Sequence, residues 1–204
     1  MKKGSMFLSL LLLACLLLPA CAERNEPQPP PPSAVAPDPP PAQPAEEPIA
    51  LEALTLEVVV EAGEADALLP QLEALSSLLG EALLERGYAP EQVTVTIGTA
   101  GGITGDALRA GGVDAACLPA ADYLAAAEGA RAVLVTDEAV CAHVAAVGTG
   151  REELDGGFCA ALAGALTESG FLERCYPRRT YIPATEEALE ALRDWAAEEG
   201  LHGL

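Results

Sequence analysis

Residues 107–127 read ALRAGGVDAACLPAADYLAAA and contain, in order, the end of a helix, a strand and the start of a second helix. Gly111 and Gly112 close the first helix, because glycine after the last turn readily adopts the conformation that ends helices. The run from Val113 to Leu118 is short and apolar, which is typical of a buried strand. A proline turn at Pro119 then leads into the second helix, so this stretch predicts a helix–strand–helix unit.

The same alternation continues on both sides of this unit. Leucines recur every three or four residues over 65–86, which indicates an amphipathic helix, and Thr185 is a suitable N-cap for the last helix. Strands separated by helices favour parallel pairing with right-handed crossovers. We therefore predict an α/β fold, a three-layer sandwich with a mostly parallel sheet. The predicted strands span residues 54–60, 93–97, 113–118, 130–136 and 141–147, and the predicted helices span 65–86, 104–110, 120–128, 154–169 and 185–199.

The first 20 residues have the features of an export signal. Lys2 and Lys3 precede an apolar run over residues 6–18, which is shorter than the roughly 20 residues that a bilayer-spanning helix needs. The run ends in Leu18-Pro19-Ala20-Cys21, which resembles the lipobox of bacterial lipoproteins. That resemblance implies a signal peptide over 1–20, cleavage before Cys21 and lipidation of its thiol.

Proline dominates the next segment. Residues 22–48 contain eleven prolines, and proline prevents both helix and sheet from propagating. Such a stretch favours extended polyproline II and acts as a spacer. We therefore predict a disordered tether over 21–50 and a single domain over 51–204. The protein is then exported, anchored to the cell membrane by its N-terminal lipid, and its domain is extracellular or periplasmic.

The charge balance excludes nucleic acid as a partner. The chain carries 31 acidic and 11 basic residues, a net charge of −20, whereas nucleic-acid binders carry an excess of Lys and Arg. Cleavage before Cys21 removes both lysines, which leaves nine arginines against 31 acidic residues, or −22. The resulting field opposes the capture of anions unless local dipoles dominate.

Motifs of catalysis and of cofactor binding are missing from the sequence. It contains no HExxH, no GxSxG, no P-loop and no dinucleotide fingerprint. We therefore expect neither an enzyme, nor a cofactor, nor a bound metal. Four cysteines besides Cys21 follow the signal, and in an oxidising compartment they predict at least one disulfide, with buried free thiols in strands as the alternative. They are Cys117, Cys141, Cys159 and Cys175.

In α/β sheets, ligands bind beyond the carboxyl ends of the strands. Four loops follow predicted strands, at residues 61–64, 98–102, 119–122 and 136–139. The glycine-rich loop at 98–102 precedes a helix, where exposed N–H groups favour anions. Three other groups are weaker candidates for a binding site. We expect the acidic cluster Glu61, Glu64 and Asp66 on a solvated face and the pair Arg178–Arg179 in a plain loop. We expect His143 in the core.

The segment at 107–127 resembles the phosphate/phosphite/phosphonate (PhnD-type) substrate-binding proteins of ABC transporters. Leu108, Arg109, Gly112, Val113 and Asp114 match that family's Ala-Leu-Arg-Ala-Gly-x-Val-Asp pattern, and Pro119 and Tyr123 match the turn and the helix that follow it. Family members have two lobes that close on the ligand, whereas this chain has the length of one lobe of a type 2 periplasmic binding protein. The family's second lobe and its serine- and threonine-rich helix start have no counterpart here.

The resemblance implies a lipoprotein that captures a small ligand without covalent chemistry and delivers it to an ABC permease. A phosphate- or phosphonate-like oxyanion is the expected ligand. The alternative is a surface lipoprotein that uses the single lobe as a protein-interaction or regulatory module. Our candidate ligand-binding residues are Thr99, Gly101, Gly102, Asp122 and Tyr123.

Overall fold

The computed structural model describes residues 47–137 and 142–201. The predicted signal peptide, the lipidation site Cys21, most of the tether and Cys141 lie outside these residues. The helices are α1 (Ala62–Leu68), η1 (Leu69–Gln71), α2 (Leu72–Leu84), α3 (Gly101–Ala110), α4 (Ala120–Ala126), η2 (Ala127–Gly129), α5 (Gly156–Glu168), α6 (Phe171–Cys175) and α7 (Glu186–Glu198). The strands are β1 (Ile49–Leu51), β2 (Leu54–Val59), β3 (Tyr88–Pro90), β4 (Val93–Gly98), β5 (Ala115–Pro119), β6 (Ala130–Thr136), β7 (His143–Gly148) and β8 (Tyr181–Pro183).

The fold is α/β, as predicted, and its main sheet has six strands in the order β4-β2-β5-β7-β6-β8. β4, β2 and β5 are parallel, with crossovers through α2 and α3. The predicted sheet was mostly parallel, and the departures from parallel pairing lie beyond β5. β7 runs antiparallel to both β5 and β6, and β8 is antiparallel to β6. The segment between β6 and β7 is too short for a crossover helix, so the chain reverses its direction there.

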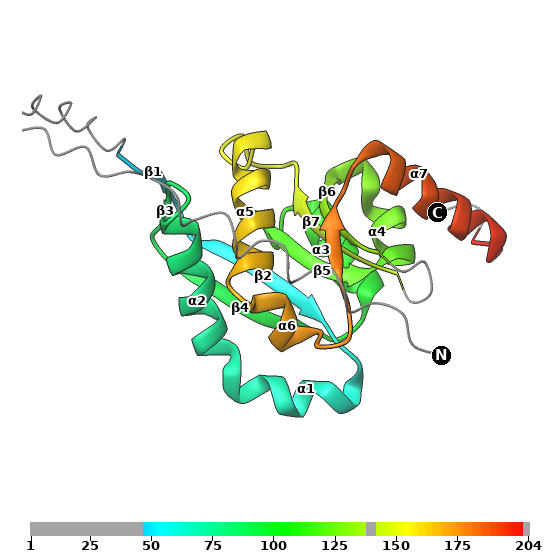
Figure 1. The fold of residues 1–204 in the computed structure, drawn as a ribbon, viewed down its shortest axis with the longest axis horizontal. Coiled ribbons are helices and arrows are strands. Elements are labelled where there is room, and N and C mark those ends of the chain that lie inside the picture. The colour runs from blue at the N-terminus through cyan, green and yellow to red at the C-terminus, as the bar shows by residue number, and fades with distance from the viewer. Residues whose placement is uncertain (1–46, 138–141, 202–204) are drawn as a thin grey trace, which may run out of the picture. The chain divides into compact units, whose positions relative to one another are not determined.

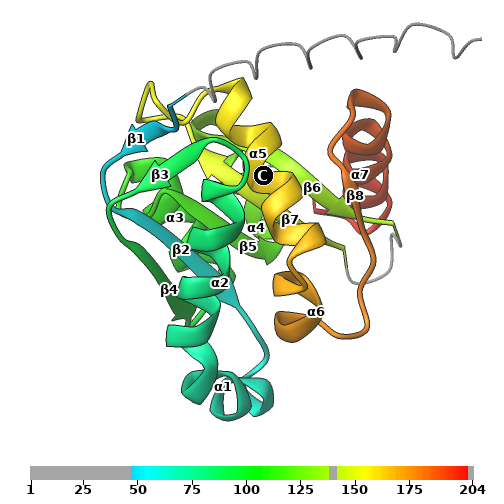
Figure 2. The same cartoon turned by 60° about the vertical axis from the view of Figure 1, so that its left-hand side comes forward.

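Helices cover both faces of this sheet and make three layers (Figures 1 and 2). α2, α5 and α6 pack on one face, and α3, α4 and α7 pack on the other. Side chains of the central strands alternate between the two cores, as the two-residue period of a strand requires. In β5, Ala115 and Cys117 face the first core, whereas Ala116 and Leu118 face the second.

The segment at 107–127 forms the elements that its sequence predicts. Leu108 is buried at the end of α3, and Gly111 has a φ of 75°, so it provides the left-handed C-cap that glycine favours. α3 begins at Gly101 rather than at 104, which makes part of the predicted glycine loop the first turn of the helix. Thr185 caps α7 as predicted, because its Oγ1 accepts a hydrogen bond of 3.2 Å from the Ala188 N–H.

The long helical run after β2 bends at η1, which contains Pro70. Over Ala62–Leu84 it is long and apolar enough to cross a membrane by composition alone. Its leucines at positions 68, 75, 79 and 83 are buried in the core of the domain. This packing accounts for the leucines of the buried face, whereas Leu69 and Leu84 are exposed.

A small second sheet lies where the chain enters the described residues. β1 pairs in parallel with β3, and Ile49 is opposite Tyr88. β1 therefore begins within the range 21–50 predicted for the tether, because Ile49 and Ala50 belong to this strand.

Candidate functional site

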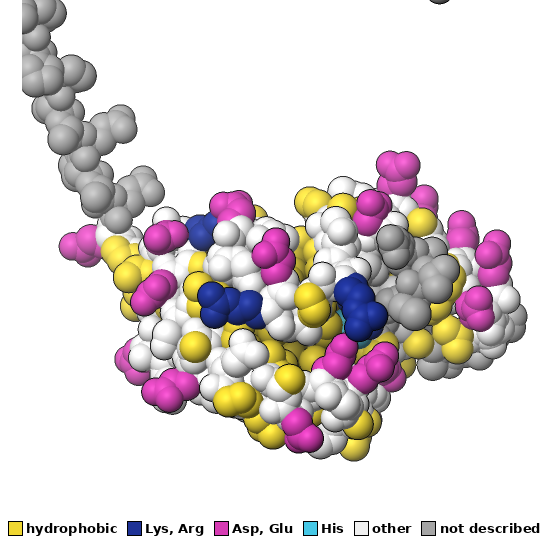
Figure 3. Space-filling view, turned by 60° about the horizontal axis from the view of Figure 1, so that its bottom comes forward, with side chains coloured by type: hydrophobic (Ala, Val, Ile, Leu, Met, Phe, Trp, Pro, Cys, Tyr) yellow, Lys and Arg dark blue, Asp and Glu magenta, His cyan; other side chains and the backbone are white. Residues whose placement is uncertain are grey.

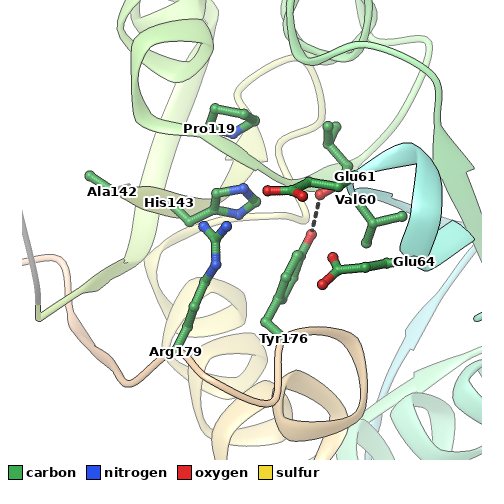
Figure 4. Close-up of a pocket in the computed structure, with 9 residues that line it drawn as sticks. Val60, Glu61, Glu64, Pro119, Ala142, His143, Tyr176 and Arg179 are labelled. Carbon is green, nitrogen blue, oxygen red and sulfur yellow. Dashed lines mark hydrogen bonds between the residues drawn. The ribbon is translucent and has the colours of Figure 1, made fainter. Parts of the chain in front are cut away.

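A pocket of about 230 Å³ lies at the edge of the main sheet where the parallel strands end (Figure 4). β2 and β5 end there, and β7 begins there because it runs in the opposite direction. This is the edge at which the sequence predicted ligand binding. The residues that line the pocket are Val59, Val60, Glu61, Glu64, Pro119, Ala142, His143, Tyr176 and Arg179.

His143 forms one wall of the pocket and is the first residue of β7. It is 5% exposed, and its ring meets that of Tyr176 edge to face, with the centroids 4.9 Å apart. Burial, together with the nearby charge of Arg179, lowers the pKa of His143 to about 3, so the ring is neutral at physiological pH. Its Nδ1 atom is buried and has no hydrogen-bond partner within the described residues.

Tyr176 forms the floor of the pocket and fixes its shape. The chain places it directly after α6, and its hydroxyl donates to the carbonyl oxygens of Val59, at 2.9 Å, and Cys117, at 3.3 Å. The side chain thereby joins the ends of β2 and β5. Burial raises the pKa of Tyr176 well above the usual value for tyrosine, so the hydroxyl stays protonated.

Three charged side chains complete the pocket. The Arg179 guanidinium lies 5.5 Å from the centroid of the Tyr176 ring, and its side chain extends toward His143 (Figure 4). Glu61 precedes α1, and Glu64 lies in the first turn of that helix. In the space-filling view, basic and acidic side chains adjoin here, with histidine visible beside the basic group (Figure 3). The pocket therefore combines one guanidinium, two carboxylates and a neutral imidazole.

The predicted ligand-binding residues lie elsewhere at this edge, and none of the five lines the pocket. Gly101 and Gly102 form the first turn of α3, and the Asp122 carboxylate lies against Gly101, so closely that an added Cβ would overlap it. A carboxylate thus lies beside the turn where an anionic ligand would have bound. Burial raises the pKa of Asp122.

Thr99 is exposed, and Tyr123 is 6% exposed within the core between the sheet and α4. Burial raises the pKa of Tyr123, although a hydrogen bond with the backbone of Ala132 opposes the shift. The structure therefore brings Gly101, Gly102 and Asp122 together, and it separates Tyr123 from them.

The sequence did not predict that the residues lining the pocket would form a binding site. His143 was expected in the core, and it is buried, but it also faces the pocket. Arg179 was expected in a plain loop and Glu61 and Glu64 on a solvated face. Tyr176 was not singled out, because it follows a five-residue helix that the sequence did not predict. The signal that the sequence offered was a single histidine within an otherwise apolar predicted strand, 141–147.

The prediction of a disulfide was wrong for the described cysteines. Cys117, Cys159 and Cys175 are buried free thiols. For Cys117, which lies in a strand, this is the alternative that the sequence left open. Burial raises the pKa of Cys175 to about 12 and that of Cys117 further, so both thiols stay protonated. Residues 47–137 and 142–201 hold no group of three or more His, Cys, Asp or Glu side chains that could bind a metal ion.

The sequence matches no known protein-family model and no curated protein. Among solved structures, the fold is similar to that of XAC2383 from Xanthomonas citri in two forms. The chloride-bound form has a TM-score of 0.52 at 11% identity, over 73% of this chain and 98% of that one. The ATP-bound form has a TM-score of 0.50 at 10% identity over the same shares. At this identity, the likeness shows that the two chains share an α/β fold.

Proposed function

We propose that this protein is an exported lipoprotein whose domain captures a small ligand in the pocket at the carboxyl edge of its sheet. In this respect it resembles the solute-binding component of a phosphate/phosphonate-type ABC transporter, with an ABC permease as its partner. Binding is non-covalent, and the ligand fills a preformed polar site. The membrane holds the protein through the lipid on Cys21.

The unsatisfied Nδ1 atom of His143 is the observation that carries this proposal. A buried polar atom without a partner costs about 1–3 kcal/mol, and buried polar groups in native proteins nearly always have one. This atom belongs to a side chain that is 5% exposed and lines a pocket beside Arg179. A bound ligand would supply the missing partner.

A protein-interaction module is less well supported. The large exposed apolar residues of the described chain are Ile49, Leu69, Leu84 and Ile103, and they belong to four different elements. Apolar residues scattered singly over a surface are normal in soluble proteins, whereas interaction sites gather them in one patch. The pocket, with its charged side chains and buried imidazole, is the more specific feature.

The proposal is tested by measuring the melting temperature of the detergent-purified full-length chain with single compounds at millimolar concentration. The panel contains phosphate, phosphite, methylphosphonate, simple amines, amino acids and, because the structural neighbour was solved with it, ATP. A ligand at 100 times its Kd stabilises the folded state by about 2.7 kcal/mol. We expect at least one compound to raise the melting temperature, and a panel without any such compound contradicts capture.

The anchor is tested separately by metabolic labelling with palmitate in a bacterial host. The variant Cys21→Ala is expected to lose the label and to leave the membrane fraction. Cys15→Ala is the matched control, because this cysteine lies within the apolar run of the predicted signal. Equal labelling of both variants would contradict lipidation at Cys21.

A further inference from the structure

The chemistry of the pocket walls narrows the class of ligand. Resting on the proposed capture function, the geometry points to a small zwitterion, with one ammonium group and one carboxylate group, as the ligand of this pocket. Its ammonium group meets Glu61 and Glu64, and its carboxylate meets Arg179 and His143. This differs from the phosphate-like oxyanion that the family resemblance implies.

The acidic wall selects for a cation. Glu61 and Glu64 both line the pocket, and both are exposed at its rim. A carboxylate accepts hydrogen bonds and donates none, so these groups favour a donor with positive charge. An ammonium group has three N–H donors and can contact both carboxylates. The same wall repels an oxyanion, whose oxygens would face carboxylate oxygens.

Arg179 and His143 favour a carboxylate. A guanidinium has five N–H donors in a planar fork that matches a carboxylate, so Arg179 can bind one while it retains its stacking on Tyr176. His143 adds a second donor when its neutral ring carries the proton on Nδ1, the atom that has no partner in the described chain. One ligand carboxylate can therefore bridge the guanidinium and the imidazole.

The volume of the pocket and the net charge of the chain also favour a small zwitterion as the ligand. The pocket has about 230 Å³, below the roughly 300–1,000 Å³ of sites for drug-sized ligands, so the ligand is small. The chain has a net charge of −20, which opposes the approach of a dianion such as phosphate. A zwitterion has no net charge and can still satisfy both walls.

The test is titration calorimetry on the full-length chain in detergent with β-alanine and L-alanine. Propionate and ethylamine each carry one half of the ligand chemistry, and inorganic phosphate represents the oxyanion class. We expect both zwitterions to bind, and both half-ligands to bind at least about tenfold more weakly, because each loses one set of charged hydrogen bonds.

Two variants assign the walls of the pocket. Glu64→Gln is expected to weaken β-alanine binding about tenfold and to leave propionate binding unchanged or stronger. Arg179→Lys keeps the charge but removes the fork, and is expected to weaken both β-alanine and propionate. Glu190→Gln, an equal charge change at an exposed position of α7, is the control and should bind as the parent protein does.

The outcomes separate the ligand class from the capture function. Binding of phosphate but not of the zwitterions overturns the ligand class and leaves capture standing. Binding of zwitterions that is unaffected by Glu64→Gln and Arg179→Lys overturns the assignment to this pocket. If none of the probes binds and the wider panel also fails, both proposals fall.

Discussion

Tyr176 and Tyr181 are neighbours whose hydroxyl groups have opposite roles. Their ring centroids are 6.1 Å apart. The Tyr176 hydroxyl donates to the carbonyl oxygens of Val59 and Cys117, whereas the buried Tyr181 hydroxyl has no partner within the described residues. Deleting a bonded hydroxyl leaves its acceptors unsatisfied, and deleting an unbonded one removes a desolvation cost. The same substitution is therefore informative at both positions.

Tyr176→Phe is expected to lower the free energy of unfolding by about 1–3 kcal/mol, because two buried carbonyl groups lose a donor. Tyr181→Phe is expected to be neutral or to stabilise the protein slightly. Urea denaturation followed by circular dichroism measures both. Equal destabilisation by the two variants would contradict this assignment of roles.

His143 makes the stability of the fold dependent on pH. Its pKa is about 3 in the folded protein and about 6.5 in the unfolded chain, so below pH 6.5 the unfolded state binds a proton that the folded state does not. The stabilisation is complete above pH 6.5 and is lost progressively as the pH falls toward 3. At pH 4.5 the loss is about 2–3 kcal/mol.

The measurement compares urea midpoints at pH 7.5 and pH 4.5 for the parent protein and for His143→Gln. Carboxylates also titrate in this range, but they do so equally in both proteins. The parent protein should therefore lose about 2–3 kcal/mol more than the variant. Parallel pH profiles for the two proteins would show that His143 is protonated in the folded state.

At the scale of elements, Asp114 joins the start of β2 to the start of β5 and to the loop after β7. Its Oδ2 accepts from the N–H, at 2.7 Å, and the hydroxyl, at 2.9 Å, of Thr55. Its Oδ1 accepts from Arg151 at 2.9 Å, and the same guanidinium nitrogen donates to the carbonyl oxygen of Ala53. The aspartate of the Gly-Val-Asp segment thus has a role in the fold, at the edge of the sheet opposite the pocket.

Asp114→Asn is expected to cost about 1–3 kcal/mol of unfolding free energy, because it weakens charge-assisted hydrogen bonds at a largely buried site. Asp106→Asn is the control, since its pairing with Arg109 lies within one helix and both side chains are mostly exposed. Such surface pairs contribute about 0.3–0.5 kcal/mol. Thermal or urea unfolding ranks the two variants, and a larger loss in Asp106→Asn would contradict the argument.

The longer elements could be predicted because their patterns are strong. Leucine spacing identified the helix that contains α2, and the segment ARAVLVT identified β6 at its observed bounds. The direction of β7 could not be predicted, because alternation indicates a strand without its direction. β1, β3 and β8 have three residues each, too few for a periodic signal.

The strand order predicted which edge of the sheet would hold the pocket. It did not predict which side chains would line the pocket. Val59 and Pro119 end β2 and β5, within one residue of the ends of the predicted strands at 54–60 and 113–118, so the position of the pocket could be expected. Tyr176 and Arg179 reach it from a segment after α6, more than 50 residues further along the chain. The packing of α6 against α5 and α2 brings that segment to the strand ends.

At the scale of the whole molecule, the surplus of acidic residues is a source of repulsion. The chain carries a net charge of −20, and four of the five described ion pairs have at least one exposed partner. Exposed ion pairs contribute little to stability, whereas like charges on a compact chain repel one another throughout. Screening by salt should therefore weaken the repulsion between acidic residues more than it weakens the attraction within ion pairs.

Raising the NaCl concentration from 10 mM to 1 M shortens the Debye length from about 30 Å to about 3 Å. We expect the melting temperature to rise by about 2–4 °C, which corresponds to about 1 kcal/mol for a chain of this size. Choline chloride should act similarly if screening is the cause. A fall in melting temperature with salt would show that ion pairs dominate.

β2 separates the two ends of the domain that matter most for handling the protein. The described chain enters through β1, just before β2 begins, and the pocket lies where β2 ends. Six residues of strand place about 20 Å of sheet between them. A sensor surface coupled through a residue of β1, such as Ile49, would therefore lie at the edge of the sheet opposite the pocket and leave the mouth of the pocket open to flowing solution.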